Sequence, residues 1–283
     1  MRERLDLNSV KPSKARSFIY STAIGRPILR IFSSRRLANM YAGYLNSRLS
    51  KIEIKRFVKK YKIDLSEYKP KKYRSFNEFF TREIRPECRP VDTEPTSLIA
   101  PCDGNLTVFT IDENSIFRIK GFDYSLNTLL RNEELAKQFE GGICLVFRLT
   151  VKNYHRYGFF DGGTAEDSVF IAGRLHAVRP DVLGKRRVFS ENCREYTLLH
   201  TDNFGDALQI EVGAMFVGRI VNNGKKQFVR GEEKGFFEFG GSTIIVLLKK
   251  GVAEIESEIL ENTHNNFETI VKYGERIGCA VQK

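Results

Sequence analysis

The sequence contains no tryptophan, only four histidines and no long apolar run. The best apolar stretch, residues 243–248, has the length of a strand and ends in two lysines, far short of the roughly 20 residues that span a bilayer. Residues 1–7 alternate charged and apolar side chains and lack the continuous apolar segment of a secretory signal. We therefore expect no export and, at most, a peripheral association with a membrane.

Cysteines are few, odd in number and scattered along the chain. They are Cys88, Cys102, Cys144, Cys193 and Cys279. They lack the close spacing of a structural zinc site and the even count of a disulfide framework, so we predict reduced thiols in an intracellular compartment and no metal. The sequence also lacks a P-loop and the glycine spacing of a dinucleotide fingerprint.

The composition is that of an ordinary globular protein. The chain has 283 residues, of which 41% are hydrophobic and 29% charged, enough for one large or two small domains. Its 46 lysines and arginines against 35 aspartates and glutamates give a net charge of +11, which favours an anionic partner. The basic residues form no single tract and no nucleic-acid-reading module is recognisable, so we expect a partner other than nucleic acid.

The chain divides into two regions of different texture. In residues 1–75, arginine and lysine alternate with apolar residues at helical spacing, as in residues 17–32 and 35–49, and Pro27 should kink or divide the first segment. Such basic, partly apolar helices can lie on an anionic membrane surface. Ordinary helices packed on a core would show the same pattern.

The second region spans 76–283 and begins with a short helix at residues 76–82 and a proline-containing connector at 85–95. There, short apolar runs separated by glycines predict strands, with one helix at 126–139. The predicted strands are residues 105–111, 142–149, 168–171, 196–200, 207–212, 214–221 and 243–248. The pattern predicts an α+β fold with N-terminal helices on a β-rich domain.

Three residues are candidates for chemistry. His155 follows an apolar strand and precedes a glycine-rich turn, where substrate can reach a side chain that is held in place. Asp103 lies in the turn APCDG, which ordinary turn chemistry also explains. Ser242 follows two glycines, and its hydroxyl can approach the Gly241 carbonyl because glycine has no Cβ. An ordinary turn or β-bulge also explains this sequence.

Five segments together resemble the phosphatidylserine decarboxylases, in the same order and at similar spacing. They are FNEFFTREIRPECRPV at 76–91, APCDG at 100–104, YHRY at 154–157, VGAMFVGRI at 212–220 and KGFFEFGGST at 234–243. The resemblance implies a barrel-sandwich-like catalytic core and a homodimer of processed protomers. It also implies a peripheral protein on the cytoplasmic face of the cell membrane, bound to phosphatidylserine in an anionic membrane.

The resemblance further implies a proenzyme that cuts itself between Gly241 and Ser242, giving a β chain of residues 1–241 and an α chain of 242–283. Ser242 would become a pyruvoyl group, which forms a Schiff base with phosphatidylserine and accepts electrons as CO2 leaves, yielding phosphatidylethanolamine. The family's Asp, His and Ser act as a relay for self-cleavage, and Asp103 and Ser242 match two of them. His155 is our candidate for the proton donor in decarboxylation.

One position departs from the family pattern. The family commonly reads YHRxH, whereas Gly158 replaces the second histidine here. His155 could serve both steps, another histidine such as His200 could complete the site, or self-processing could fail. The last case would be a processing-deficient homologue that binds acidic lipid without turnover. A pyruvoyl enzyme for a soluble amino acid is a further alternative, against which the basic, apolar N-terminal region argues.

Overall fold

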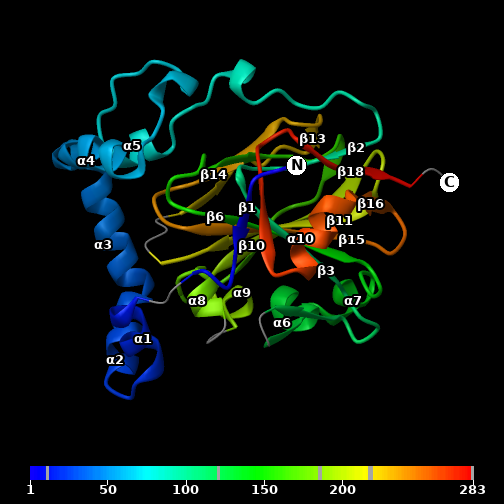
Figure 1. Cartoon of the computed structure of the whole chain (residues 1–283), viewed down its shortest axis with the longest axis horizontal. Helices are drawn as coiled ribbons and strands as arrows, with labels where there is room; N and C mark the ends of the chain where they lie inside the picture. Colours follow the sequence, from blue (N-terminus) through cyan, green and yellow to red (C-terminus); the bar gives the residue numbers. More distant parts are fainter. Residues whose placement is uncertain (11–12, 120–121, 184–186, 216–218, 282–283) are drawn as a thin grey trace.

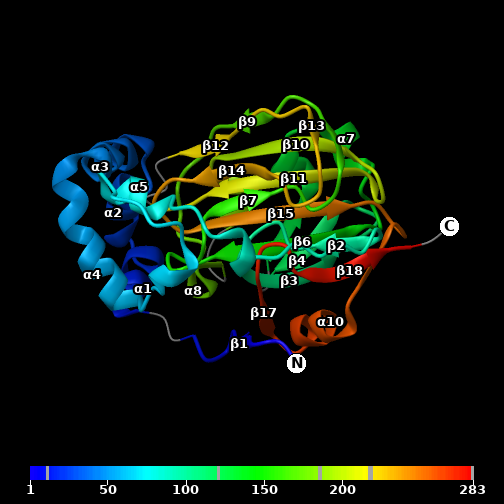
Figure 2. The same ribbon diagram turned by 90° about the horizontal axis from the view of Figure 1, so that it is seen from above.

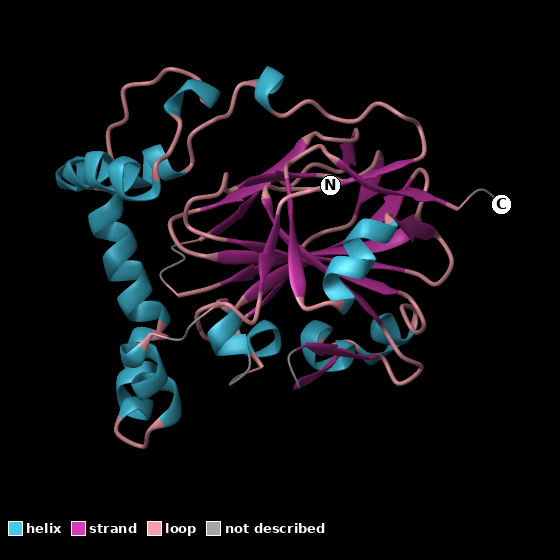
Figure 3. Ribbon diagram, in the orientation of Figure 1, coloured by secondary structure: helices cyan, strands magenta, loops and turns pink. Residues whose placement is uncertain are grey.

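The computed structural model describes residues 1–10, 13–119, 122–183, 187–215 and 219–281. Helices from the first third of the chain gather at one end, and antiparallel sheets with shorter helices form the rest (Figure 1, Figure 3). The α+β prediction is confirmed. The division at residue 75 stays a prediction.

Four helices form the N-terminal region. They are α1 (Lys14–Ser21), α2 (Gly25–Phe32), α3 (Arg35–Asn46) and α4 (Ile52–Tyr61), with a 3-10 turn at Arg48–Lys51. The predicted segment 17–32 is divided, but the break precedes Pro27, which lies in the first turn of α2 where its missing N–H costs nothing. Glycine at position 25 allows the start of α2 to lie close to α1, because a Cβ there would lie 2.6 Å from the backbone of Ile19.

An aromatic cluster joins these helices to the segment before Ser242. Helix α5 (Phe76–Phe80), which confirms the short helix expected at 76–82, buries Phe76 and Phe80 against Phe57 of α4. Phe239 packs on the same cluster, with its ring centroid 5.2 Å from that of Phe76 and 5.0 Å from that of Phe80. Two 3-10 turns, Leu65–Glu67 and Pro86–Cys88, flank α5 in the chain.

A large antiparallel sheet of ten strands forms the core of the molecule (Figure 2). Its order is β1 (Arg4–Asp6), β17 (Phe267–Val271), β3 (Gly104–Thr110), β6 (Ile143–Leu149), β15 (Ser242–Leu248), β11 (Gly205–Gly213), β10 (Arg194–Thr201), β8 (Gly163–Ala165) and β13 (Gln227–Phe228), with β9 (Val169–Ile171) also on β10. Strand β15 is buried at every residue, which explains its continuous apolar run. Among the described residues the sheet is open, and smaller sheets pack beside it.

A three-stranded sheet covers the face of the large sheet toward which Ser242 points. It comprises β12 (Ile220–Asn222), β14 (Glu233–Phe237) and β7 (Arg156–Gly158). The buried Nζ of Lys234 lies 2.8 Å from the Glu211 carboxylate and ties the two sheets together. Helices α8 (Pro180–Leu183), α9 (Val188–Glu191) and α10 (Ser257–His264) lie on the opposite face.

The remaining elements show where the sequence pattern was misleading. The helix expected at 126–139 is two helices, α6 (Leu126–Leu130) and α7 (Glu133–Lys137), because Arg131 is left-handed and the Asn132 side chain caps α7. Of the strand expected at 214–221, only the part from Ile220 is a strand, and residues 216–218 lie outside the described residues. A third sheet, β16 (Ala253–Ile255), β18 (Arg276–Ala280) and β2 (Ser97–Ile99), and the hairpin β4 (Ile116–Ile119) and β5 (Phe122–Ser125) complete the fold.

Every helix within the described ranges is too short or too polar to serve as a membrane span.

Candidate active site

Ser242 begins the central strand of the large sheet. It pairs with Gly213 on β11 and with Leu149 on β6, and its side chain is completely buried. Its hydroxyl has no hydrogen-bond partner among the described residues, which costs a buried polar group about 1–3 kcal/mol. Gly240, two residues earlier, has a φ of 149°, a conformation open mainly to glycine. The Ser242 hydroxyl is thus a potential nucleophile without a hydrogen-bond partner among the described residues, and it directly follows a turn that requires glycine.

His155 is fully buried beside the same turn. Its Nδ1 lies 2.9 Å from the Asn153 carbonyl, so Nδ1 carries the proton and donates, and Nε2 has no hydrogen-bond partner among the described residues. Its ring packs 4.3 Å from that of Phe80, and Phe237 N–H donates to its carbonyl. These contacts fix His155 against the segment that leads to Ser242.

The pKa of His155 is lowered to about 3, mainly because burial penalises the charged ring. The backbone groups of Asn153 and Gly240 act in the opposite direction, and the positive charge of Arg82 adds to the lowering. His155 is therefore neutral at pH 7. A neutral ring with an unpartnered Nε2 can accept a proton, and its protonated form would be a strong acid.

Asp103 lies away from both residues and is held by other partners. Arg89 donates to both of its carboxylate oxygens, at 2.8 and 2.7 Å, and the N–H of Tyr273 donates to Oδ1 at 2.9 Å. Strand β6 separates β3, which follows Asp103, from β15, so Asp103 and Ser242 are on the order of 10 Å apart. No hydrogen bond or ion pair within the described residues joins Asp103 to His155 or Ser242.

The structure gives a steric reason for Gly158. A Cβ at this position would clash with the Tyr273 hydroxyl and would lie 2.6 Å from the Glu232 carbonyl. Tyr273 is itself fixed, because its hydroxyl donates to the Gly231 carbonyl at 2.8 Å while its N–H binds Asp103. The Tyr273 hydroxyl therefore fills the space that a histidine at 158 would need, which the local sequence does not reveal.

Two other histidines, His200 and His176, lie at different distances from Ser242. His200 lies at the far end of β10, exposed, and contacts Asp206 and Glu166. Along β15, six residues lie between Ser242 and the position level with His200, a distance of about 20 Å. His200 therefore does not complete the site. His176 is buried and nearer, since Asn192 binds both its backbone and the Gly213 carbonyl, but its Nε2 faces Glu191 at 3.2 Å.

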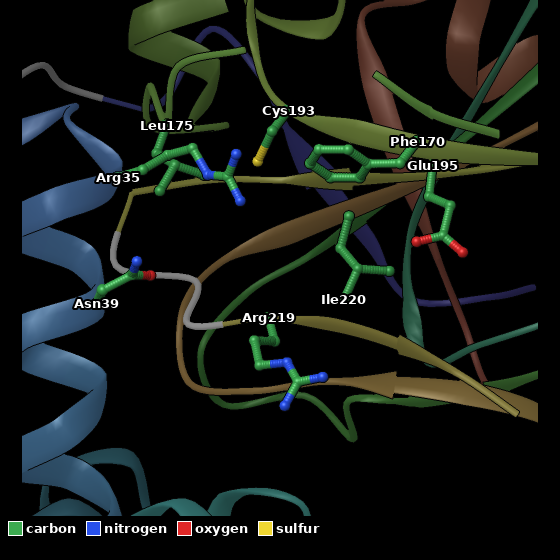
Figure 4. Close-up of a pocket in the computed structure, with 8 residues that line it drawn as sticks. All are labelled: Arg35, Asn39, Phe170, Leu175, Cys193, Glu195, Arg219 and Ile220. Carbon is green, nitrogen blue, oxygen red and sulfur yellow. The ribbon is translucent and has the colours of Figure 1, made fainter. Parts of the chain in front are cut away.

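A pocket lies between helix α3 and strand β10 (Figure 4). Its volume is about 280 Å³, and helix α3, strand β10 and the start of β12 contribute to its lining. Arg35 and Arg219, which line it, were not singled out by the sequence analysis. They come from segments 184 residues apart, and only the fold brings them together.

Comparisons with known proteins show the family of this chain. The family model described as phosphatidylserine decarboxylase matches residues 76–279. The chain belongs to the phosphatidylserine decarboxylase family. It is 45% identical over 262 residues to phosphatidylserine decarboxylase proenzyme 2 of Clostridium acetobutylicum, covering 92% of this chain and 90% of that protein.

Two further relatives carry the name phosphatidylserine decarboxylase proenzyme. That of Clostridium perfringens is 40% identical over 280 residues, covering 96% of this chain and 95% of the relative. That of Ruminiclostridium cellulolyticum is 39% identical over 288 residues, covering 99% and 96%. The family resemblance in the sequence is thus confirmed, and the chain is an enzyme of the decarboxylase class.

Proposed function

We propose that this chain is a self-processing proenzyme that converts phosphatidylserine to phosphatidylethanolamine and CO2. One observation carries the proposal: the Ser242 hydroxyl is buried and unpartnered directly after two glycines, at the start of the central strand. Membership in a family whose relatives are named proenzymes supports it. Cleavage between Gly241 and Ser242 would give chains of 1–241 and 242–283.

In the cleavage step, Ser242 Oγ attacks the Gly241 carbonyl carbon. The C–N bond breaks, the acyl group moves to oxygen as an ester, and the proton from Oγ passes to the released nitrogen. Loss of the Ser242 Cα proton then breaks the Cβ–O bond, which releases the Gly241 carboxylate and leaves a dehydroalanine. One water hydrolyses the dehydroalanine to the pyruvoyl group and ammonia. We assign this proton transfer to Nε2 of His155, the unpartnered ring nitrogen beside Gly240. Because the His155 pKa is low, the neutral ring is a weak base, so we expect slow self-cleavage.

The residues around Ser242 suit a pyruvoyl group, because the site is buried and its hydroxyl already lacks a competing partner. That group supplies a ketone that accepts the electrons released as CO2 leaves. His155 would hold the proton at Nε2 and return it to carbon. Because its pKa is low, the ring carries this second proton in only a small fraction of molecules at pH 7, so we expect this step to be slow as well.

A second candidate function is a processing-deficient homologue that binds acidic lipid without turnover. Two observations favour it: Tyr273 occupies the space at Gly158, and Asp103 is bound to Arg89 rather than to a histidine. In that case the Ser242 hydroxyl would stay unreacted.

Intact mass under denaturing conditions separates the two, with Ser242→Ala as the uncleavable control. Two chains divided between residues 241 and 242, the smaller with a blocked pyruvoyl terminus, would support the proenzyme. A single chain of 32.5 kDa after prolonged incubation, alike in both proteins, would refute it and favour the lipid-binding homologue. Incubation at several temperatures is needed because we expect the reaction to be slow.

We further propose that α1–α4 dock the protein on an anionic membrane, at the cytoplasmic face. Residues 14–62 contain 13 lysines and arginines and one acidic residue, Glu53. Exposed apolar side chains lie among them, namely Phe18, Ile24, Ile31, Phe32, Met40, Leu49 and Ile52. Basic groups near an anionic surface contribute about 1 kcal/mol each, and salt screens them.

Co-sedimentation with vesicles tests this docking. Binding to vesicles rich in phosphatidylserine, weakened by added salt and lost with uncharged phosphatidylcholine, is the expected result. Binding that ignores salt and lipid charge would contradict it. We also expect a homodimer, which light scattering of the native protein measures directly.

A further inference from the structure

The pocket of about 280 Å³ lies between the N-terminal helices and the edge of the large sheet. Arg35 and Asn39 come from α3, and Glu195 comes from β10. Cys193 and Arg219 are the residues directly before β10 and β12. Figure 4 shows Arg35 extending from α3 toward β10. The pocket thus joins the helical region to the catalytic domain.

The strand register places this pocket on the same face of the sheet as Ser242. Paired residues point to the same side, so Ser242 and its partner Gly213 share a face, as do Glu211 and its partner Glu195 two residues along. A Cβ on Gly213 would point at Cys193 Sγ, 3.2 Å away, and at Leu175, 3.3 Å away, and both residues line the pocket. Cys193 and Leu175 thus fill the space above Gly213, and they form the wall of the pocket on the side of Ser242.

The pocket carries two guanidinium groups without an ion pair. Neither Arg35 nor Arg219 lies within 4.0 Å of a carboxylate among the described residues, although Arg35 packs 5.3 Å from the Phe170 ring centroid. Glu195 also lines the pocket, but its carboxylate accepts a hydrogen bond from the Asn222 amide at 2.8 Å. Arg35 is the first residue of α3, so the positive end of that helix dipole adds to the field.

We propose that this pocket binds the phosphodiester of the lipid headgroup, with Arg35 and Arg219 as its anion-binding residues. The proposal rests on the proposed function and deepens it. Four bonds separate the phosphorus of phosphatidylserine from its amine nitrogen, a span of about 5 Å. One strand spacing is also about 5 Å, so an amine at Ser242 leaves the phosphate at the level of Gly213. The side chains of Cys193 and Leu175, which form the pocket wall there, would turn aside to admit it.

This arrangement explains how the lipid is distinguished from a free amino acid. Serine carries the same amine and carboxylate but has no phosphate for the two arginines to bind. Arg35 stands on α3, which also carries the exposed Met40, so the headgroup would enter from the side on which we propose the bilayer. Arginine suits this task because its planar fork binds phosphate through two hydrogen bonds.

Kinetics on a monomeric short-chain substrate tests the proposal without a membrane. Arg35→Gln and Arg219→Gln are compared with Arg36→Gln, which makes the same charge change on the same helix outside the pocket lining. With dihexanoyl phosphatidylserine below its micelle concentration, we expect each pocket variant to raise KM about tenfold, equivalent to about 1.4 kcal/mol. The kcat, the extent of cleavage and the Arg36→Gln kinetics should stay unchanged.

Binding to the uncleavable Ser242→Ala protein supplies a readout that does not need turnover. Glycerophosphoserine, inorganic phosphate and free serine are titrated by calorimetry. We expect glycerophosphoserine to bind more tightly than the other two, and Arg35→Gln to weaken it about tenfold. Equal affinity for inorganic phosphate would mean a general anion site and would overturn the headgroup assignment.

The outcomes separate this proposal from the function on which it rests. A wild-type protein that cleaves and decarboxylates, with unchanged KM in both pocket variants, would refute the pocket assignment alone. A wild-type protein that neither cleaves nor releases CO2 would refute the proposed function, and the titrations with Ser242→Ala would still decide whether the pocket binds the headgroup.

Discussion

Replacing Asp103 by alanine should destabilise the protein strongly, because the carboxylate neutralises a buried arginine. The side chains of Asp103 and Arg89 are 8% and 7% exposed, and two hydrogen bonds of 2.8 and 2.7 Å join them. Removing one partner of such a pair leaves the other charge uncompensated, at a typical cost of 3–5 kcal/mol.

The lower end of that range applies here. Arg89 keeps a contact of 3.3 Å with Glu67, whose side chain is 35% exposed, and a hydrogen bond to the Cys88 carbonyl. These partners compensate part of the charge, so we expect a loss of about 3 kcal/mol in the free energy of unfolding. The lost hydrogen bond from the Tyr273 N–H is included in this figure.

Urea denaturation in the Ser242→Ala background measures the loss, because that chain stays in one piece. Arg89→Leu and the double variant complete a mutant cycle, in which the double variant should be more stable than Asp103→Ala alone. A loss below 1 kcal/mol, together with blocked cleavage when Ser242 is restored, would refute this reasoning. Asp103 would then act in the relay rather than in the ion pair.

Three further predictions concern the surrounding residues. Gly158→Ala should lower the free energy of unfolding by at least about 3 kcal/mol through the clash with Tyr273. Gly43→Ala in α3, with open space around it, is the control and should lose none. Equal effects of the two substitutions would contradict the clash. Lys234→Met should cost about 3–5 kcal/mol because it leaves Glu211 buried and unpaired, and denaturation at neutral pH measures this. The pKa of His155 is about 3 in the folded protein and about 6.5 in the unfolded chain, so between these values the unfolded state binds more protons. The free energy of unfolding therefore falls as the pH falls, by about 1.4 kcal/mol per pH unit. His155→Gln should lack this component between pH 6 and 4, and identical pH slopes in both proteins would show that the ring is not buried neutral.

Much of the sheet was predictable because strands bury apolar residues in short runs. The run at 243–248 corresponds to β15, and 105–111 and 142–149 lie within a residue or two of β3 and β6. Local backbone effects were harder to foresee. Nothing in the apolar pattern of 126–139 shows that Arg131 adopts a left-handed conformation that divides the helix.

Site residues were predictable one by one, but their partners were not. Ser242 and His155 stand in recognisable segments, and the structure brings both beside Gly240. The Arg89 that binds Asp103 lies 14 residues away, and the Tyr273 that fills the space at Gly158 lies 115 residues away. Such long-range contacts depend on strand order, which a single sequence does not encode in a readable pattern.

The position of β15 bears on what a cut before Ser242 would leave behind. Both of its neighbours, β6 and β11, precede residue 241, and β17 likewise lies between β1 and β3. Residues 242–283 would thus stay threaded through the sheet as a non-covalent subunit that native purification does not separate. Residues 4–6 also hold the smaller chain, since β1 pairs with the outer edge of β17. Trimming residues 1–10 would therefore loosen the small chain from the opposite end of the sequence.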